Sequence, residues 1–142
     1  MIVSTKGRYA LRVMIDLAEH YNGDFIPMKD VAERQELSLK YLERILPVLS
    51  KNNLVTGIHG KGGGYRLNRE PGDYKVGEIL RLTEGDLAPV SCLSKDRKFD
   101  SYLTEYRTMK MWNDFHKMTN EFFDSITIAD LMKAECIDNY VI

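Results

Sequence analysis

Four glycines in five residues, Gly60-Lys61-Gly62-Gly63-Gly64, are the feature that most constrains how this chain can fold. Two short β-prone runs, residues 54–58 and 65–68, flank them. Runs of this kind separated by a glycine-containing turn are typical of a β-hairpin. A dinucleotide-binding loop needs a strand and spaced glycines followed by a helix, and the chain has no Gly-Lys-Ser or Gly-Lys-Thr sequence. The pattern therefore predicts a hairpin and argues against nucleotide binding.

Three helical segments are expected before this hairpin. From residue 4 to about residue 21 the apolar positions recur in steps of one and three, which traces one face of an α-helix: Tyr9, Ala10, Val13, Met14, Leu17, Ala18 and Tyr21. A short second helix is expected from about Pro27 to about Arg34, because proline is favoured in a first turn. Ser38 can cap a third helix by accepting a hydrogen bond from a free backbone amide. The apolar face of the third helix is Leu39, Leu42, Ile45, Leu46 and Leu49, and Pro47 predicts a bend within it.

Three helices followed by a hairpin, with a tight link between the second and third helix, is the order of a winged helix-turn-helix domain. The expected fold is mostly α with a small β-hairpin wing, and we assign this domain to residues 1–85. In this layout the third helix enters the major groove of DNA, and the wing contacts the backbone or the minor groove. The candidate DNA-binding residues are Lys6, Ser38, Lys40, Tyr41, Glu43 and Arg44 in the helices and His59 and Lys61 in the wing. Lysine and arginine are also common on solvated helix faces, so charge alone leaves both interpretations open.

The second half of the chain has a different pattern. Val76, Ile79, Leu80 and Leu82 predict a fourth helix that ends at Gly85, and residues 86–98 have the mixed composition of a loop. A long helix is expected from about Asp100 to Asp124, with one apolar stripe for its own domain and one for a second copy. A single larger core is the alternative. The predicted dimerisation residues are Tyr102, Tyr106, Met109, Trp112, Phe115 and Phe122, in a dimerisation helix and tail assigned to residues 99–142.

Composition narrows the classes of function. The chain has 142 residues, 44% of them hydrophobic, which is enough for a core. Residues 1–70 carry 11 Lys/Arg against 8 Asp/Glu and residues 71–142 carry 9 against 13, so the first half is the better match for a polyanion. The sequence has no apolar run of membrane-helix or signal-peptide length, which predicts no membrane partner and a cytoplasmic location. No nucleophile–base pair stands out, so an enzyme is not expected.

Three motifs carry a resemblance to a known family. They are residues 4–11 (STKGRYAL), residues 31–34 (VAER) with residues 37–43 (LSLKYLE), and residues 60–67 (GKGGGYRL). In this order and spacing they are similar to the Rrf2 family of bacterial transcription regulators, from residue 2 to about 85 and weakly to about 134. The resemblance implies a homodimeric winged-helix repressor or activator that binds a near-palindromic DNA operator. It also implies base readout by the third helix, and a minor-groove contact at His59, where several relatives have an arginine.

The same resemblance bears on cofactors. Members that hold an iron–sulfur cluster have three cysteines in the loop before the long helix; Cys92 matches the first of them, and residues 93–111 contain no other cysteine. Met109 takes the position of a histidine ligand, and Arg8 and Arg12 take positions from which some members recruit ligands. Because a cluster needs a thiolate-rich site, no cofactor is expected. Cys92 is kept as a candidate redox or metal residue, the alternative being a small apolar residue.

The C-terminal residues suggest a further partner. The branch of the family without cluster cysteines ends in an aromatic-rich tail that finishes in isoleucine, and its members pair with cysteine synthase. By resemblance Tyr140, Val141 and Ile142 bind that enzyme, whereas a tail that packs on its own dimer is the alternative. The implied function is a repressor of cysteine or sulfur metabolism. The alternatives are an iron–sulfur, thiol-based or nitric-oxide-sensing regulator of the same family and, from another class, a protein-interaction module without DNA binding.

Overall fold

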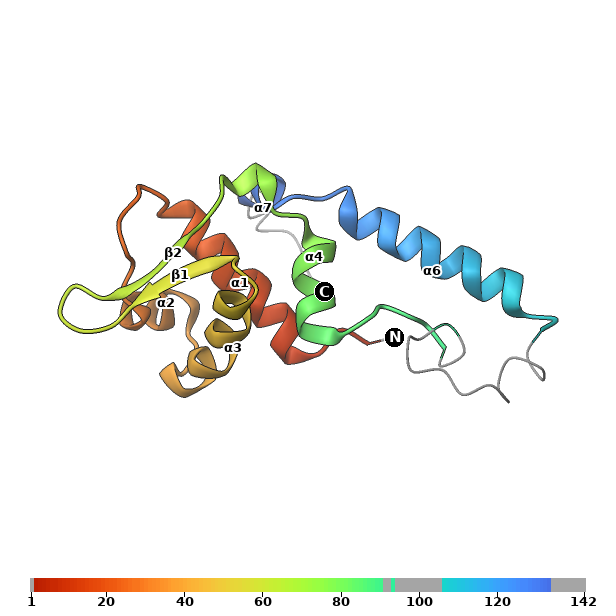
Figure 1. Cartoon of the computed structure of the whole chain (residues 1–142), viewed down its shortest axis with the longest axis horizontal. Helices are drawn as coiled ribbons and strands as arrows, with labels where there is room; N and C mark the ends of the chain where they lie inside the picture. The colour runs from red at the N-terminus through yellow and green to blue at the C-terminus, as the bar shows by residue number, and fades with distance from the viewer. Residues whose placement is uncertain (1, 91–92, 94–105, 134–142) are drawn as a thin grey trace, which may run out of the picture.

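The computed structural model describes residues 2–90, 93 and 106–133 of the chain (Figure 1). Its fold is mostly helical with one two-stranded antiparallel hairpin, which confirms the expected fold class. The elements in chain order are α1 (Thr5–Glu19), α2 (Met28–Gln35), α3 (Leu39–Lys51), β1 (Val55–Ile58), β2 (Gly64–Leu67), the 3-10 turn η1 (Pro71–Asp73), α4 (Val76–Glu84), α6 (Met109–Asp124) and α7 (Ile128–Met132).

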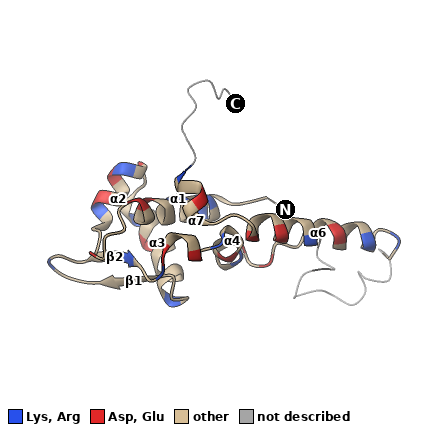
Figure 2. Ribbon diagram, turned by 90° about the horizontal axis from the view of Figure 1, so that it is seen from above, with Lys and Arg blue, Asp and Glu red and all other residues tan. Residues whose placement is uncertain are grey.

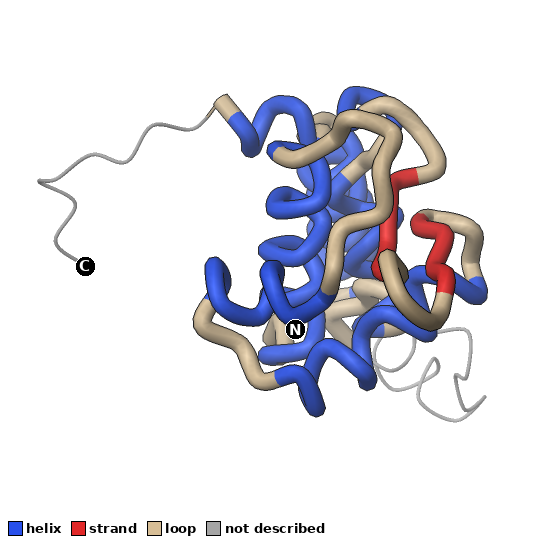
Figure 3. Tube along the Cα trace, turned by 90° about the vertical axis from the view of Figure 1, so that its left-hand side faces the viewer, coloured by secondary structure: helices blue, strands red, loops and turns tan. Residues whose placement is uncertain are grey.

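Helix α1 is the centre of the core. Its predicted apolar face is buried at Ala10, Val13, Met14, Leu17 and Ala18, whereas Tyr21 is 37% exposed because the helix ends before it, at Glu19. Helices α2, α3, α4 and α7 and strand β2 all contact α1. In the end-on view of Figure 3 the two strands lie along one side of the helical stack. Helix α1 thus positions α2, α3 and β2 directly, whereas β1 is positioned by its pairing with β2 and its packing on α3.

A buried ionic network fixes α2 against α1. Asp16 is 1% exposed and accepts two hydrogen bonds from the Arg34 guanidinium, at 3.0 and 2.7 Å, and one from the Gln35 amide at 3.0 Å. The hydrogen bond to Asp16 raises the pKa of Arg34 above its ordinary value. Arg12 adds a hydrogen bond to the backbone carbonyl of Gln35. Because a buried carboxylate needs such partners, the network defines where α2 ends and where the link to α3 begins.

The hairpin is attached to the core at its base. Ile26 forms a bridge to β2, with Ile26 N donating to Tyr65 O at 2.8 Å and Tyr65 N donating to Ile26 O at 2.9 Å. Gly64 has φ +155, and a Cβ atom on it would lie 2.1 Å from the Ile26 carbonyl oxygen. Only glycine allows this approach, so one member of the glycine run serves to dock the hairpin rather than to form its turn.

The last helices differ from the expectation. Residues 106–108 form a turn and α6 begins at Met109, so the helix does not extend back to Asp100 among the residues that the structure describes. The helix α6 projects away from the winged part of the molecule (Figure 1). After α6 the chain returns, and Ile128 of α7 is fully buried in the core around α1. Part of the assigned dimerisation segment therefore belongs to the main core.

Candidate nucleic-acid interface

Helix α3 presents a polar face to solvent. Its buried positions are Leu42, Ile45, Leu46 and Leu49, which confirms the predicted periodicity except at Leu39. Lys40, Glu43 and Arg44 are exposed on the opposite side. Ser38 caps the helix by accepting a hydrogen bond from Tyr41 N at 3.1 Å, as its sequence position predicts. The helix stays continuous through the exposed Pro47.

Lys6 lies beside α3. Lys6, Tyr41 and Arg44 line a hollow of about 320 Å³ between the first turns of α1 and the outer face of α3. The Tyr41 ring packs edge-on against Tyr9, with 5.1 Å between the ring centroids. Two cations and a phenol around one hollow are suited to a phosphate group of a nucleic-acid backbone. The fold thus brings together three of the predicted DNA-binding residues from helices far apart in the sequence.

The wing carries its predicted residues at the tip. His59 and Lys61 are exposed in the turn between β1 and β2, which projects from the body of the molecule (Figure 2). Gly60 and Gly62 have φ of +92 and +78, a conformation that glycine adopts without strain. No side chain covers the backbone at these two positions, so a phosphate can approach the main chain closely.

Sequence reasoning missed two residues of this surface. Leu39 is 50% exposed in the first turn of α3, although it was assigned to the buried face. Arg66 of β2 is exposed; its guanidinium lies 4.4 Å from the Phe25 ring centroid and donates to the Gly23 carbonyl at 2.8 Å. Successive side chains of a strand point to opposite faces, so the alternation along β2 predicts that Arg66 faces solvent.

The predicted dimerisation residues occupy different environments. Tyr106, Phe115 and Phe122 are 62%, 44% and 60% exposed. Trp112 is half-buried, and Met109 is 7% exposed and so lies inside the chain's own fold. Met111 and Met118, which form the second apolar stripe of the sequence together with Phe115 and Phe122, are 54% and 67% exposed and share the spacing of one helical face with them. We call these four residues, Met111, Phe115, Met118 and Phe122, the α6 apolar stripe.

The other side of α6 is anchored to α4. Arg81 donates to Asp124 at 2.7 and 3.4 Å and to the Asn120 side-chain oxygen at 3.0 Å. Phe123 packs against a small apolar cluster of Val76, Leu80 and Leu87. One face of α6 is therefore held by its own chain while the α6 apolar stripe is exposed.

Several predicted residues lie outside the described part of the chain. They are Tyr102, Cys92 and the tail residues Tyr140, Val141 and Ile142. Cys136, the second cysteine, lies outside it as well. Within residues 2–90, 93 and 106–133, no three His, Cys, Asp or Glu side chains come together as a metal site. Among the described helices, none combines the length and apolar character needed to cross a bilayer.

Comparison with known proteins gives a consistent set of relatives. The family model Rrf2, described as an iron-dependent transcriptional regulator, matches residues 3–134. The HTH-type transcriptional regulator IscR of Aliivibrio salmonicida is 34% identical over 141 residues, which cover 99% of this chain and 80% of that protein. The structure of CymR (YrzC), the global cysteine regulator of B. subtilis, has a TM-score of 0.78 at 32% identity and covers 96% of this chain and 99% of that one. T. potens IscR has a TM-score of 0.71 at 40% identity and covers 99% of this chain and 95% of that one.

These findings contradict the expectation that this regulator has no cofactor. The matching family is described as iron-dependent, and relatives at 34% and 40% identity are named IscR. The expectation was based on cysteine positions alone, and neither cysteine of the chain is among the described residues. The match over residues 3–134 and the 34% identity to a relative of which 80% is covered show the family directly. The chain belongs to the Rrf2 family of transcriptional regulators.

Proposed function

We propose that this protein is a homodimeric, sequence-specific DNA-binding regulator that acts as a repressor. The observation that carries the proposal is the exposed face of α3, where Lys40, Glu43 and Arg44 lie outward on a helix that Ser38 caps. Capped recognition helices of this kind read base edges in the major groove with their N-terminal residues. Membership of a family of transcriptional regulators supports the same function.

Each residue has a chemical role in this proposal. Arg44 and Lys40 donate to guanine acceptors, and Glu43 accepts from a cytosine amino group. Leu39, exposed beside the cap, can contact a thymine methyl group. Lys6 and Tyr41 hold a phosphate in the hollow that they share with Arg44. His59 and Lys61 at the tip of the wing contact the backbone or the minor groove.

The α6 apolar stripe supports the dimer. Its four large apolar side chains are 44–67% exposed on a helix whose opposite face is held by α4. An exposed apolar patch of this kind marks an interaction site. Pairing of two copies through α6 about a two-fold axis sets the recognition helices about 34 Å apart, one turn of DNA.

The decisive experiment is selection of bound duplexes from random DNA, followed by titration of the winning site. We expect a near-palindromic site whose affinity falls with salt at a slope of about −0.9 per phosphate contact. The variant carrying both Lys40→Ala and Arg44→Ala should lose the preference for that site. Equal binding of this variant and the unmodified protein would instead support a protein-interaction module.

The relatives suggest two processes that this protein could regulate. Regulation of cysteine or sulfur metabolism is supported by the likeness to CymR, the global cysteine regulator of B. subtilis. Iron-dependent regulation is supported by the description of the family model and by the IscR relatives. Iron and sulfide analysis of anaerobically purified protein, together with the genes beside the selected sites, distinguishes the two. Binding of cysteine synthase by Tyr140, Val141 and Ile142 stays a prediction, which deletion of Ile142 tests.

A further inference from the structure

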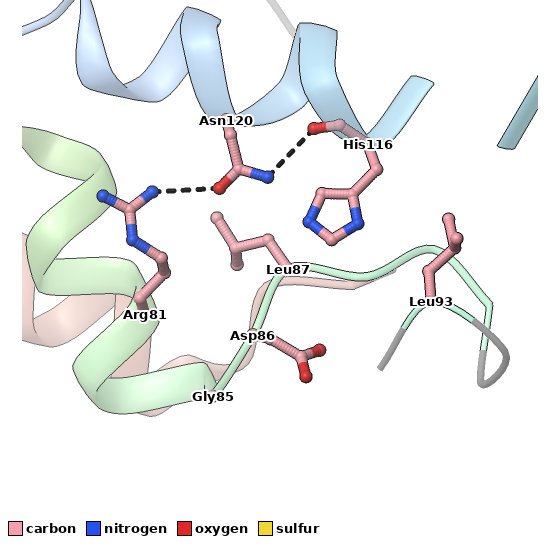
Figure 4. Close-up of a pocket in the computed structure, with 7 residues that line it drawn as sticks. All are labelled: Arg81, Gly85, Asp86, Leu87, Leu93, His116 and Asn120. Atoms are coloured by element: carbon pink, nitrogen blue, oxygen red, sulfur yellow. Dashed lines mark hydrogen bonds between the residues drawn. The ribbon is translucent and has the colours of Figure 1, made fainter. Parts of the chain in front are cut away.

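Two hollows of the molecule differ in how far their polar side chains are already used. In the hollow between α4 and α6, the Arg81 guanidinium donates to the Asn120 side-chain oxygen at 3.0 Å (Figure 4). In the hollow between α1 and α3, the side chains of Lys6, Tyr41 and Arg44 form no hydrogen bond or ion pair within the described part of the chain. The polar groups of the second hollow are therefore available to a ligand.

An aromatic contact joins the two helices beside this second hollow. Tyr9 follows Lys6 by three residues on α1, so the two side chains lie on the same face of that helix. The Tyr9 ring packs edge-on against Tyr41 of α3, with 5.1 Å between the centroids and 68° between the ring planes, as aromatic pairs prefer. Both rings are half-buried against the core around α1. Tyr9 therefore restricts the positions that the Tyr41 ring can take.

The Tyr9 ring is itself held by a cation. The Arg12 guanidinium lies 5.0 Å from the Tyr9 ring centroid, which is a cation–π distance. Arg12 Nε donates to the Gln35 side-chain oxygen at 3.3 Å, and a second guanidinium nitrogen donates to the Gln35 backbone carbonyl. The Gln35 amide donates in turn to the buried carboxylate of Asp16 at 3.0 Å. A continuous series of contacts thus runs from Asp16 to Tyr41.

We propose that Tyr9 is a positioning residue for the phosphate contact of this hollow and that Arg12 holds the Tyr9 ring in place. The inference rests on the proposed function, in which Lys6, Tyr41 and Arg44 share a phosphate of the nucleic-acid backbone. Tyr9 does not line the hollow, so it acts through Tyr41. A side chain that has to be immobilised on binding costs about two- to tenfold in affinity, and a Tyr41 ring that is held beforehand avoids this cost.

Fluorescence anisotropy of the full-length protein, with the selected operator and with a random duplex, tests this role. Tyr9→Leu removes the ring and should weaken both complexes by the same factor, about two- to tenfold, because a phosphate contact carries no sequence information. Tyr9→Phe keeps the ring and should bind as the unmodified protein does. Tyr21→Leu removes an aromatic ring at a position that is 37% exposed beyond the other end of α1, and this matched control should also bind unchanged.

The same substitution in a second background distinguishes positioning from a general effect on the fold. In a Tyr41→Phe protein the hydroxyl that Tyr9 positions is absent, so Tyr9→Leu should have no further effect on the affinity for either duplex. A purely structural role of Tyr9 predicts the same loss in both backgrounds. Thermal unfolding shows whether Tyr9→Leu is folded. If it is not, Arg12→Lys replaces it in the cycle with the same expectation, because lysine keeps the charge but cannot form both bonds to Gln35.

Three outcomes would overturn this inference while the proposed function stands. They are unchanged binding of Tyr41→Phe, unchanged binding of Tyr9→Leu, and a loss on Tyr9→Leu that is equal in both Tyr41 backgrounds. Failure of the proposed function gives a different result, because the unmodified protein would then bind neither duplex, and this inference would be overturned with it.

Discussion

A Cβ atom on Gly7 would lie 2.3 Å from Oε1 of Glu84, so the bare backbone at Gly7 is what lets this carboxylate reach the first turn of α1. There Oε1 accepts hydrogen bonds from Ser4 N at 3.0 Å, Ser4 Oγ at 2.5 Å and Gly7 N at 3.1 Å. The first amides of a helix have no partner within the helix and carry partial positive charge. The last residue of α4 therefore caps the helix at the centre of the core.

We expect Gly7→Ala to lower the free energy of unfolding, although alanine favours a helix by about 1 kcal/mol over glycine. The methyl group displaces Glu84 from the amides of the first turn, and the loss of a helix cap costs about 0.5–2 kcal/mol. Urea unfolding followed by circular dichroism measures the change. A variant that is more stable than the unmodified protein by the full helix-propensity difference of about 1 kcal/mol would show that the carboxylate contributes nothing.

A double-mutant cycle separates this contact from helix propensity. In a Glu84→Ala background no carboxylate is left to displace, so Gly7→Ala should be neutral or stabilising by up to about 1 kcal/mol. Gly23→Ala is not a suitable control because Gly23 has φ +87, which strains any side chain. Equal effects of Gly7→Ala in both backgrounds would contradict the proposed contact.

Replacing Arg44 by alanine should weaken binding to the selected operator more than binding to random duplex. An arginine that bonds a guanine contributes about 1–3 kcal/mol of discrimination, which is about fivefold to a hundredfold in affinity. Fluorescence anisotropy at several salt concentrations measures the affinity for the selected operator and the affinity for the random duplex. Lys117→Ala, 75% exposed on α6, is the matched cation control and should change neither affinity. The assignment of Arg44 fails if both duplexes weaken by the same factor.

The α6 apolar stripe should control the oligomeric state. Met118→Asp places a charge at a position that is 67% exposed in the single chain, so the monomer tolerates it while a dimer would have to bury it. We expect sedimentation equilibrium to show a monomer and operator affinity to fall. Lys117→Asp is the neighbouring control and should stay dimeric. A dimeric Met118→Asp protein would place the interface elsewhere.

Sequence patterns within single helices predicted much of this fold. Ser38 begins α3 and Gly85 ends α4 as expected, because capping and helix termination depend on residues within a turn of each other. The start of α6 at Met109 was not predictable from apolar spacing, which continues through Tyr106 without a break. The cap that Glu84 provides was also not predictable, because it joins Ser4 to a residue 80 positions later, and only the packing of α4 on α1 brings them together.

Ionisation of Tyr74 should lower the free energy of unfolding at alkaline pH. Its ring is fully buried, and its hydroxyl donates to Leu54 O at 2.5 Å and accepts from Asn68 N at 2.9 Å and Arg69 N at 3.0 Å. Burial raises the pKa of Tyr74 above its ordinary value, although the two backbone donors partly oppose this. The stability that the neutral phenol provides is therefore fully present below the ordinary pKa of about 10 and is lost as pH rises through the higher folded value.

We expect Tyr74→Phe to be less stable by about 1–3 kcal/mol at neutral pH, since it removes the hydroxyl that bonds Leu54 O, Asn68 N and Arg69 N at the base of the hairpin. The difference in free energy of unfolding between Tyr74→Phe and the unmodified protein should be constant up to about pH 10 and shrink above it. Urea unfolding at a series of pH values measures this difference. Tyr21→Phe, at a position 37% exposed beyond the end of α1, is the control and should show no such narrowing. A difference that stays constant through the alkaline range would mean that ionisation of Tyr74 is not coupled to folding.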